Sequence, residues 1–340
     1  LSGNVVLTMT NTQYFFDVAW LLIASALVFF MQAGFLALET GLTRNKNSIN
    51  VAIKNIIDFG IAIILFWLFG FAFMFGESHF GLIGTSDFSP EFLANNSWRT
   101  AFFIFQAMFV ATAATIISGA VAERLNFRSY ILITLLMSGV VYPIFGHWAW
   151  AGSLNNGAGW LAELGFVDFA GATVVHSLGG WAALAICIII GPRLGRFQNG
   201  KSVKIHGHNL PIALLGVIFL SFGWIGFNGG SVFYFNQNVP LVISNTILAG
   251  CSGMIAALII GWYIKKSPEI SFPMNGLLAG LVSITASAHA VNSLSSIIIG
   301  AISGMVMIAV DCILEKFKID DVVGVIPVHV GGGVWGTIAV

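Results

Sequence analysis

The sequence predicts an all-α integral membrane protein whose helices cross the bilayer many times. Of its 340 residues, 57% are hydrophobic and only 8% are charged, whereas about 25% are charged in an ordinary soluble domain. Long apolar runs alternate with short charged or turn-rich segments, and each run is near the length of about 20 residues that a helix needs to span the hydrocarbon core. Strands of a membrane barrel would be about half as long and would alternate in polarity. The net charge of zero gives no reason to expect a nucleic-acid partner.

The apolar runs predict ten membrane spans when the chain is divided at its charged segments. Their boundaries are set to within a few residues by the flanking polar residues. The ten predicted spans are Phe16–Thr43, Val51–Phe75, Thr100–Ala122, Ser129–Gly152, Phe169–Ile190, Leu210–Val232, Leu241–Ile264, Phe272–Ala290, Ser293–Leu314 and Val322–Val340.

The basic residues predict the direction of these spans. With the N-terminus outside, 13 of the 14 lysines and arginines lie in or beside the inner loops, and Arg99 alone lies outside. Cytoplasmic loops carry such an excess of Lys and Arg. A misplaced span near the middle of the chain would put basic residues on both sides of the membrane. The number of spans and their direction therefore support each other. Because the chain stops at Val340 inside an apolar run, we expect the polypeptide to continue.

Ionisable residues within membrane spans are costly and are therefore functional candidates. Several of those found here lie near predicted span ends, where we expect water or lipid headgroups to reach them. His176 and His329 instead lie about eight residues inside the fifth and tenth spans, near mid-membrane. The candidates are Asp17, Glu39, Asp58, His147, Asp168, His176, His289, Asp311 and His329.

The two histidines share a local pattern. Val175–Gly180 and Val328–Gly333 both read V-H-x-x-G-G. Because they lie five spans apart, the two copies point in opposite directions across the membrane. This offset predicts an inverted repeat of five plus five spans, with the substrate site between the halves, and the glycines would let neighbouring backbones approach closely. The alternative is two unrelated core histidines bound to nearby carbonyl groups.

Paired imidazoles at mid-membrane would suit a small polar solute. A neutral imidazole offers one donor and one acceptor, and burial favours the neutral form. Paired imidazoles would do little to lower the barrier for a hydrated ion, because burying an unpaired charge is very costly. Trp150 lies near the outer end of the fourth span, and Phe109 and Phe227 lie within the third and sixth. An aromatic face attracts a small cation that has lost its water.

At these residues the sequence resembles the ammonium transporter family (Amt/Mep/Rh), and within it the Amt-type branch. The resemblance covers nearly the whole chain and follows the family's order. It is carried by QAGFLALETGLTRNKN (32–47), FQAMF and GAVAERLNF (105–127), DFAGATVVH (168–176) with GPRLGRF (191–197), FGWIGFNGGS (222–231) and DDVVGVIPVHVGGGVWG (320–336).

The resemblance implies a role for each matching residue. His176 and His329 match the twin histidines of the family's pore, and Phe109 and Phe227 match the stacked pair that closes its outer entrance. Trp150 and Ser231, with Phe109, match the site that recruits ammonium. Asp168 matches an acid that shapes this site without touching the ion. No catalytic residue, metal site or cofactor is implied, and the three cysteines form no metal-binding or disulfide pattern.

The resemblance also implies the architecture and the partners. The family fold has eleven spans in two inverted five-span halves, here about 14–192 and 209–340, and assembles as a homotrimer. We therefore expect an eleventh span and a cytoplasmic tail or signalling domain beyond this chain. Two departures from the family pattern lie near the second histidine: Val322 follows the acidic pair where proline is usual, and Val330 follows His329 where glycine is usual.

These observations support two functions. In the first, the protein is a channel in the cell membrane that recruits ammonium outside, removes its proton and conducts ammonia past the twin histidines. In the second, it is an ammonium sensor coupled to a cytoplasmic signalling domain or regulatory protein, with little or no transport; the altered residues around His329 motivate this alternative. A channel for carbon dioxide fits less well, because Trp150 and Ser231 suit a cation. We expect no enzyme, since the sequence contains no nucleophile–base pair or phosphate-binding loop.

Overall fold

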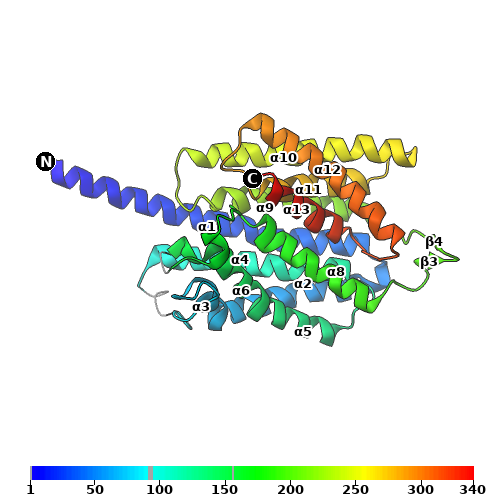
Figure 1. The fold of residues 1–340 in the computed structure, drawn as a ribbon, viewed down its shortest axis with the longest axis horizontal. Coiled ribbons are helices and arrows are strands. Elements are labelled where there is room, and N and C mark those ends of the chain that lie inside the picture. Colours follow the sequence, from blue (N-terminus) through cyan, green and yellow to red (C-terminus); the bar gives the residue numbers. More distant parts are fainter. Residues whose placement is uncertain (1, 91–94, 155–156) are drawn as a thin grey trace.

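The computed structural model describes residues 2–90, 95–154 and 157–340, and the side chains from residue 11 onward within these ranges. Helices dominate both halves of the chain (Figure 1). The first half contains α1 (Ser2–Leu42), α2 (Asn45–Leu65), η1 (Phe66–Gly70), α3 (Phe71–Phe75), β1 (Ser78–His79), β2 (Ile83–Gly84), α4 (Ser97–Ala120), α5 (Phe127–Leu136), η3 (Met137–Val141), α6 (Tyr142–Trp150), η4 (Ala151–Leu154), α7 (Trp160–Glu163), η5 (Ala172–Ser177) and α8 (Leu178–Ile190). The second half contains β3 (Phe197–Gln198), β4 (Lys201–Ser202), α9 (Leu210–Gly230), α10 (Asn238–Lys265), α11 (Ser271–Ile284), α12 (Ser293–Lys316), η6 (Pro327–Gly331) and α13 (Gly332–Ile338).

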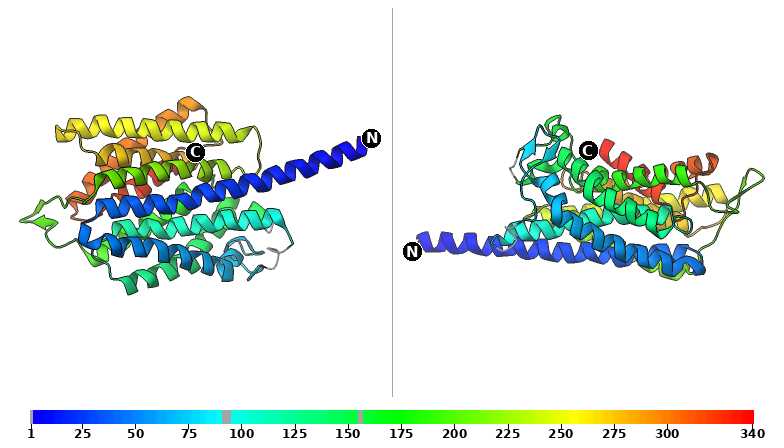
Figure 2. Two further views of the ribbon diagram at one scale, coloured as in Figure 1. Left: turned by 180° about the vertical axis from the view of Figure 1, so that it is seen from behind. Right: turned by 90° about the horizontal axis from the view of Figure 1, so that it is seen from below.

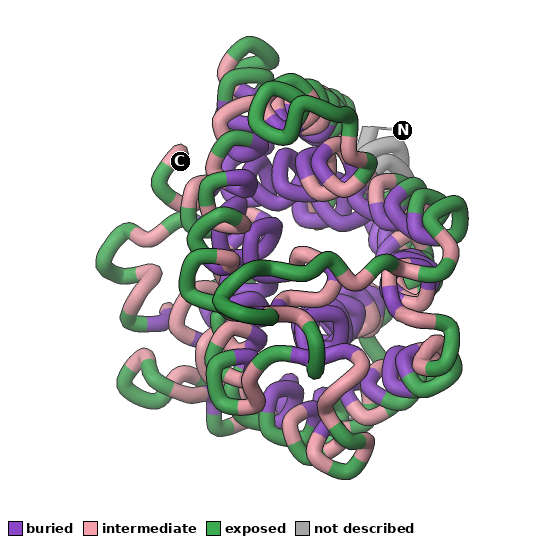
Figure 3. Tube along the Cα trace, turned by 90° about the vertical axis from the view of Figure 1, so that its right-hand side faces the viewer, coloured by how far each residue is buried: buried purple, intermediate pink, exposed green. Residues whose placement is uncertain are grey.

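The long helices lie side by side in one bundle, and α1 projects from it at its N-terminal end (Figures 1 and 2). We call this end of the bundle the N-terminal side. The opposite end carries the antiparallel β3–β4 pair and is called the β3–β4 side. Viewed along the helices, buried residues face the interior of the bundle (Figure 3). Many large apolar side chains are nevertheless exposed on its outside, as expected of helices that face lipid.

Eight helical stretches among the described residues are long and apolar enough to cross a membrane. They correspond to eight of the ten predicted spans. The other two predicted spans contain shorter helices: α11 has 14 residues, and η6 and α13 together cover Pro327–Ile338. The ten-span arrangement therefore remains a prediction.

Small residues allow the first helices of the two halves to cross closely. On α9, a methyl group added at Gly216 would lie 2.6 Å from the Gly34 carbonyl oxygen of α1, and one added at Gly226 would lie 2.6 Å from that of Ala24. Glycines also line the contacts of α10 with α11 and α12, where Gly253 faces Gly276 and Gly304. Such stripes are typical of membrane helices, which associate through close van der Waals packing.

Asparagine residues fix where four of the helices begin. The side chains of Asn96, Asn126, Asn209 and Asn292 each accept a hydrogen bond from the backbone N–H three residues later, at the starts of α4, α5, α9 and α12. Each bond satisfies an N–H group that has no partner within the helix.

Within the described residues, four short π-helical segments, η1, η3, η5 and η6, interrupt the regular α-helical pattern. A π-helical turn inserts one extra residue and changes the direction of nearby side chains, and such turns are frequent at functional sites. The segments η5 and η6 contain His176 and His329.

Candidate functional site

The structure brings together, at the centre of the bundle, the two histidines that the sequence places near mid-membrane. The ring centroids of His176 and His329 are 5.2 Å apart, and their planes differ by 22°. Their exposed fractions are 0% and 5%. Among the described residues, no hydrogen-bond partner exists for either ring nitrogen of His176 or for Nδ1 of His329. The alternative of two unrelated histidines bound to carbonyl groups does not describe this arrangement.

Aromatic rings continue from the histidine pair toward the N-terminal side. The ring of Phe227 lies 5.2 Å from that of His176. Phe109 stacks on Phe227 at 4.0 Å, with an angle of 18° between the planes, and both side chains are buried. Trp150 completes the row, 6.3 Å from Phe109 and edge-on to it. Five rings from α4, α6, α9, η5 and η6 thus form a single file.

Polar groups lie next to Trp150 and Phe227 in this file. The Trp150 indole N–H donates to the backbone carbonyl of Asp168 at 2.7 Å. The Asp168 carboxylate accepts from four consecutive backbone N–H groups, those of residues 171–174, at 2.8–3.0 Å. The Ser231 hydroxyl, at the end of α9, donates to the Phe227 carbonyl at 2.9 Å. Asp168 therefore caps the start of η5 and anchors Trp150, while its own oxygens are occupied by backbone groups.

The segment before His329 repeats this capping arrangement. Asp321 lies eight residues before His329, as Asp168 lies eight before His176. Its carboxylate accepts from the N–H groups of Gly324 and Ile326 at 3.1 and 2.6 Å. The glycine three residues after each aspartate has a positive φ, 107° at Gly171 and 85° at Gly324, which glycine adopts at little cost.

The shared sequence pattern is therefore longer than V-H-x-x-G-G. It reads D-x-x-G-x-x-x-V-H-x-x-G-G in both halves, over 168–180 and 321–333. Asp321 was missed as a site residue, although the matching spacing of an aspartate and a glycine before each histidine was visible in the sequence.

Glycines allow the two segments that contain His176 and His329 to cross in direct contact. A methyl group added at Gly180 would lie 2.8 Å from the Val330 side chain and 3.2 Å from that of His329. At Gly333, an added methyl group would overlap the Ser177 hydroxyl. The valine that follows His329 therefore fits because Gly180 leaves room for its side chain.

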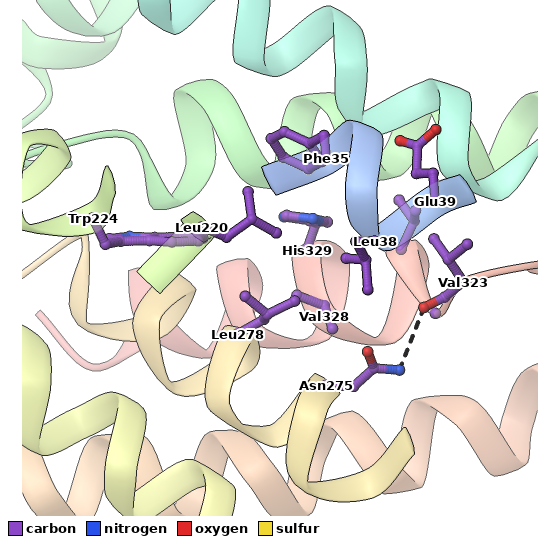
Figure 4. A pocket seen from close by; sticks show the side chains of 12 residues that line it. Phe35, Leu38, Glu39, Leu220, Trp224, Asn275, Leu278, Val323, Val328 and His329 are labelled. Carbon is purple, nitrogen blue, oxygen red and sulfur yellow. Dashed lines mark hydrogen bonds between the residues drawn. The ribbon is translucent and has the colours of Figure 1, made fainter. Parts of the chain in front are cut away.

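A narrow cavity continues the file on the β3–β4 side of His329 (Figure 4). Its free volume for water-sized molecules is about 20 Å³, which is room for one or two waters. Its walls are mostly apolar, and they come from α1, α9, α11 and the segment that leads into η6. Trp224 belongs to this wall and stacks on His176 at 5.1 Å. Its contact with His176 was not predicted, but Trp224 lies nearly one helical turn before Phe227 on α9, and residues so spaced share a helix face.

Three of the ionisable residues near predicted span ends are more deeply buried than the sequence suggested. Glu39, Asp58 and His147 have exposed fractions of 1%, 0% and 0%. The ring nitrogens of His147 lie 2.9 Å from the Ser78 hydroxyl and from the Met74 carbonyl oxygen, so this histidine is bound within the fold. His289, by contrast, is exposed and stacks on Phe169.

The arrangement suits passage of a small, weakly polar molecule. The stacked phenyl rings exclude water, and beyond them the buried imidazoles provide hydrogen-bonding groups that protein atoms do not occupy. A desolvated cation can be attracted to the faces of Trp150 and Phe109, but it would lose its hydration within the file at a large cost. Among the described residues, no group of three or more His, Cys, Asp or Glu side chains is arranged to hold a metal ion.

Comparison with known proteins identifies relatives of this sequence. The model of the Ammonium Transporter Family matches residues 19–340. A putative ammonium transporter of Synechocystis sp. is 51% identical over 95% of this chain, and ammonium transporter Amt2 of Archaeoglobus fulgidus is 43% identical over 97%. The chain spans 61% of the length of the first relative and 72% of the second.

Solved structures agree with this assignment. The protein named Sensor Amt Protein superposes with a TM-score of 0.95 at 46% identity, covering 97% of this chain and 82% of that one. Candida albicans Mep2 superposes with a TM-score of 0.86 at 29% identity, covering 94% and 71%. The sequence, the apolar helices and these similarities lead to one conclusion: the chain belongs to the ammonium transporter family and is an all-α, multi-pass protein of the cell membrane.

Proposed function

We propose that the protein conducts ammonium, recruited as the cation and carried through the bundle as ammonia. Trp150, Phe109 and Ser231 recruit ammonium on the N-terminal side. The ion loses a proton there, and ammonia passes between Phe109 and Phe227 and then along His176 and His329. The observation that carries this proposal is the single file of five rings, which ends in two buried imidazoles with unpartnered nitrogens. The names of the relatives support the substrate.

The proposal includes an orientation and an architecture. The N-terminal side faces outward, because the opposite end carries nearly all of the lysines and arginines. The chain contributes ten spans in two inverted halves, about 14–192 and 209–340. The matching aspartate, glycine and histidine positions in 168–180 and 321–333 support these halves. As in the family, the protein works as a homotrimer with one pathway in each subunit.

The pathway predicts which histidine substitution stops transport. In proteoliposomes given an ammonium pulse, His176→Ala should lower the flux at least about tenfold, the effect of losing one net hydrogen bond of about 1.4 kcal/mol. His289→Ala is the matched control, since this histidine is exposed and stacks on Phe169 outside the file. If the two substitutions lowered the flux equally, His176 and His329 would not line the pathway.

The same preparation decides the fate of the proton. A current that follows ammonium addition would show that charge crosses with ammonia, and each charge gains about 2.3 kcal/mol per 100 mV of membrane potential. Flux without current would show that ammonia crosses alone. Only if charge crosses with ammonia can the membrane potential concentrate ammonium inside.

A second candidate function is ammonium sensing. The similarity to the Sensor Amt Protein, with its TM-score of 0.95, favours this alternative. So does Val330, which places a side chain beside the pore histidine where the family pattern has glycine. A sensor would bind ammonium in calorimetry and show no flux in proteoliposomes, whereas a transporter would show both.

A further inference from the structure

The cavity next to His329 contains a second ionisable residue. Glu39 lies on α1, and its side chain lines the same cavity as His329. Figure 4 shows Glu39 toward the end of the cavity away from Trp224, with Phe35 and Leu38 on the same helix. Because Glu39 precedes Leu42, the last residue of α1, by three residues, it lies about 4.5 Å from that end of the helix at 1.5 Å per residue. A molecule leaving His329 toward the β3–β4 side therefore meets this carboxyl group.

The hydrogen bonds of Glu39 leave one of its oxygens free for a ligand. Its Oε2 accepts from the Asn55 amide at 2.9 Å and from the Ser118 hydroxyl. Among the described residues, no hydrogen bond reaches Oε1. The side chain is held firmly by its neighbours, and its second oxygen can hold or release a proton.

The charges around Glu39 do not balance without an added proton. Lys54 and Asp58 on α2 are also buried, with exposed fractions of 1% and 0%. Lys54 Nζ donates to the Leu125 carbonyl at 2.7 Å, and the Tyr130 hydroxyl donates to Asp58. Two carboxyl groups and one amine form a neutral cluster only when one carboxyl carries a proton. Neutrality is favoured because burying an unpaired charge is costly.

Of the two carboxyl groups, only that of Glu39 faces the cavity. Both oxygens of Asp58 have hydroxyl partners, since Thr115 approaches Oδ1 at 3.2 Å and Tyr130 donates to Oδ2. The titratable groups that face Glu39 are Lys54 and Asp58 on α2, Tyr130 on α5 and His329 on η6.

We propose that Glu39 is the proton-exchange residue on the β3–β4 side of the pathway. Ammonia that passes His329 takes the proton of the Glu39 carboxyl: the O–H bond breaks, an N–H bond forms, and ammonium and a carboxylate result. Ammonium then leaves to the solution on this side, and the carboxylate regains a proton from water of the same solution. The net change is one proton taken from that solution for each ammonia converted to ammonium. This inference rests on the proposed function, because it requires ammonia to reach the cavity.

The test is ammonium flux into proteoliposomes, measured over a range of internal pH. Glu39→Gln keeps the size of the side chain and its contacts with Asn55 and Ser118 but cannot exchange a proton. The expected result is a flux at least about 10²-fold lower, the usual contribution of a positioned proton donor, with the dependence on internal pH lost. Asp17→Asn is the matched control: it removes another buried carboxyl of α1, which accepts a hydrogen bond from the Phe235 backbone N–H and does not line the cavity, and it should retain most of the flux and the pH dependence.

The outcomes separate this inference from the function on which it rests. Absence of flux in the unsubstituted protein would overturn the proposed function. Normal flux in the unsubstituted protein, with the same rate and pH profile in Glu39→Gln, would overturn the role of Glu39 alone. An equal loss in Asp17→Asn and Glu39→Gln would also overturn it, because the effect would then not be specific to the carboxyl that lines the cavity.

A second measurement needs no substitution and covers the case in which Glu39→Gln does not fold. Infrared difference spectra of the unsubstituted protein in lipid are recorded on ammonium addition, with glutamate or aspartate carboxyl carbons isotopically labelled. We expect the band of a protonated, buried glutamic acid to decrease and to shift with the glutamate label. No change in a glutamic acid band, or a change that shifts only with the aspartate label, would overturn the proposal.

Discussion

At the scale of single residues, Asp168 shows how a buried acid can organise a site that it does not enter. Its two oxygens accept four backbone N–H groups of the first turn of η5. These groups have no partners inside the helix, and a negative charge at a helix N-terminus is favourable. The same residue holds the Trp150 indole through its backbone carbonyl. Asp168 thus links Trp150 to the segment that contains His176.

This geometry predicts a structural effect for Asp168→Ala. The substitution leaves four buried N–H groups without an acceptor, and we expect a loss of at least about 2–3 kcal/mol of stability together with reduced flux. Asp168→Asn keeps one acceptor oxygen and should lose less of both. Thermal unfolding in detergent, measured beside flux, checks this. If Asp168 instead bound ammonium directly, both variants would lose ammonium binding while the unfolding temperature stayed the same.

The sequence predicted some of these residues and missed others for physical reasons. The repeated V-H-x-x-G-G pattern and the family resemblance identified His176 and His329, because a histidine in the middle of an apolar run is conspicuous. From its place in the predicted span, Glu39 is expected to lie near water. Its burial depends on Asn55 of α2 and Ser118 of α4, and the position of a residue along its own helix does not reveal which neighbours cover it.

At the scale of elements, the crossing of the two histidine segments depends on residues that lack side chains. Gly180 makes room for Val330 and His329, and Gly333 makes room for Ser177. A hydroxyl hydrogen bond between Thr173 and Thr337 joins the same elements, η5 and α13. Apolar runs predict where helices lie, but they do not reveal π-helical turns such as η5 and η6. The long helices were therefore predictable, whereas the local geometry of the histidines was not.

The close crossing predicts the effect of a single methyl group. Gly180→Ala should push η6 away from α8, widen the spacing of the histidine rings and cost about 1–3 kcal/mol of stability through overpacking. Flux should fall with it. Gly60→Ala is the control, because nothing lies within 4 Å of a methyl group added there and alanine favours the helix by about 1 kcal/mol. If Gly180→Ala matched Gly60→Ala in both thermal unfolding and flux, the close contact between Gly180 and η6 would be contradicted.

At the scale of the whole molecule, ion pairs connect the two halves at the β3–β4 side. Arg193, in the segment between the halves, pairs with Glu123 at 3.1 Å and with Asp320 at 2.8 Å. Arg44, between α1 and α2, pairs with the same glutamate at 2.7 Å. The Arg193, Glu123 and Asp320 side chains are nearly inaccessible to solvent. Removing one member of such a buried pair leaves the other charge uncompensated.

This network predicts how stability depends on pH. Burial alone would raise the pKa of Asp320, but hydrogen bonds and the charge of Arg193 outweigh it and hold the pKa below its ordinary value of 3.8. A group with a lowered pKa stabilises the fold above its unfolded-state pKa, and this stability is lost as the pH falls through the folded-state pKa. The contribution should therefore be complete at neutral pH and decline below about pH 4.

Asp320→Asn tests this expectation in thermal unfolding measured from neutral to acidic pH. At neutral pH the variant should lose about 3–5 kcal/mol, the cost of breaking a buried ion pair, and its unfolding temperature should fall less steeply with acid than that of the unsubstituted protein. Glu269→Gln breaks the more exposed pair with Lys204 and should cost less than about 1 kcal/mol. Equal losses in the two variants would mean that the network at Arg193 does not hold the halves together, and that the close contacts of α1 with α9 and of α8 with η6 suffice.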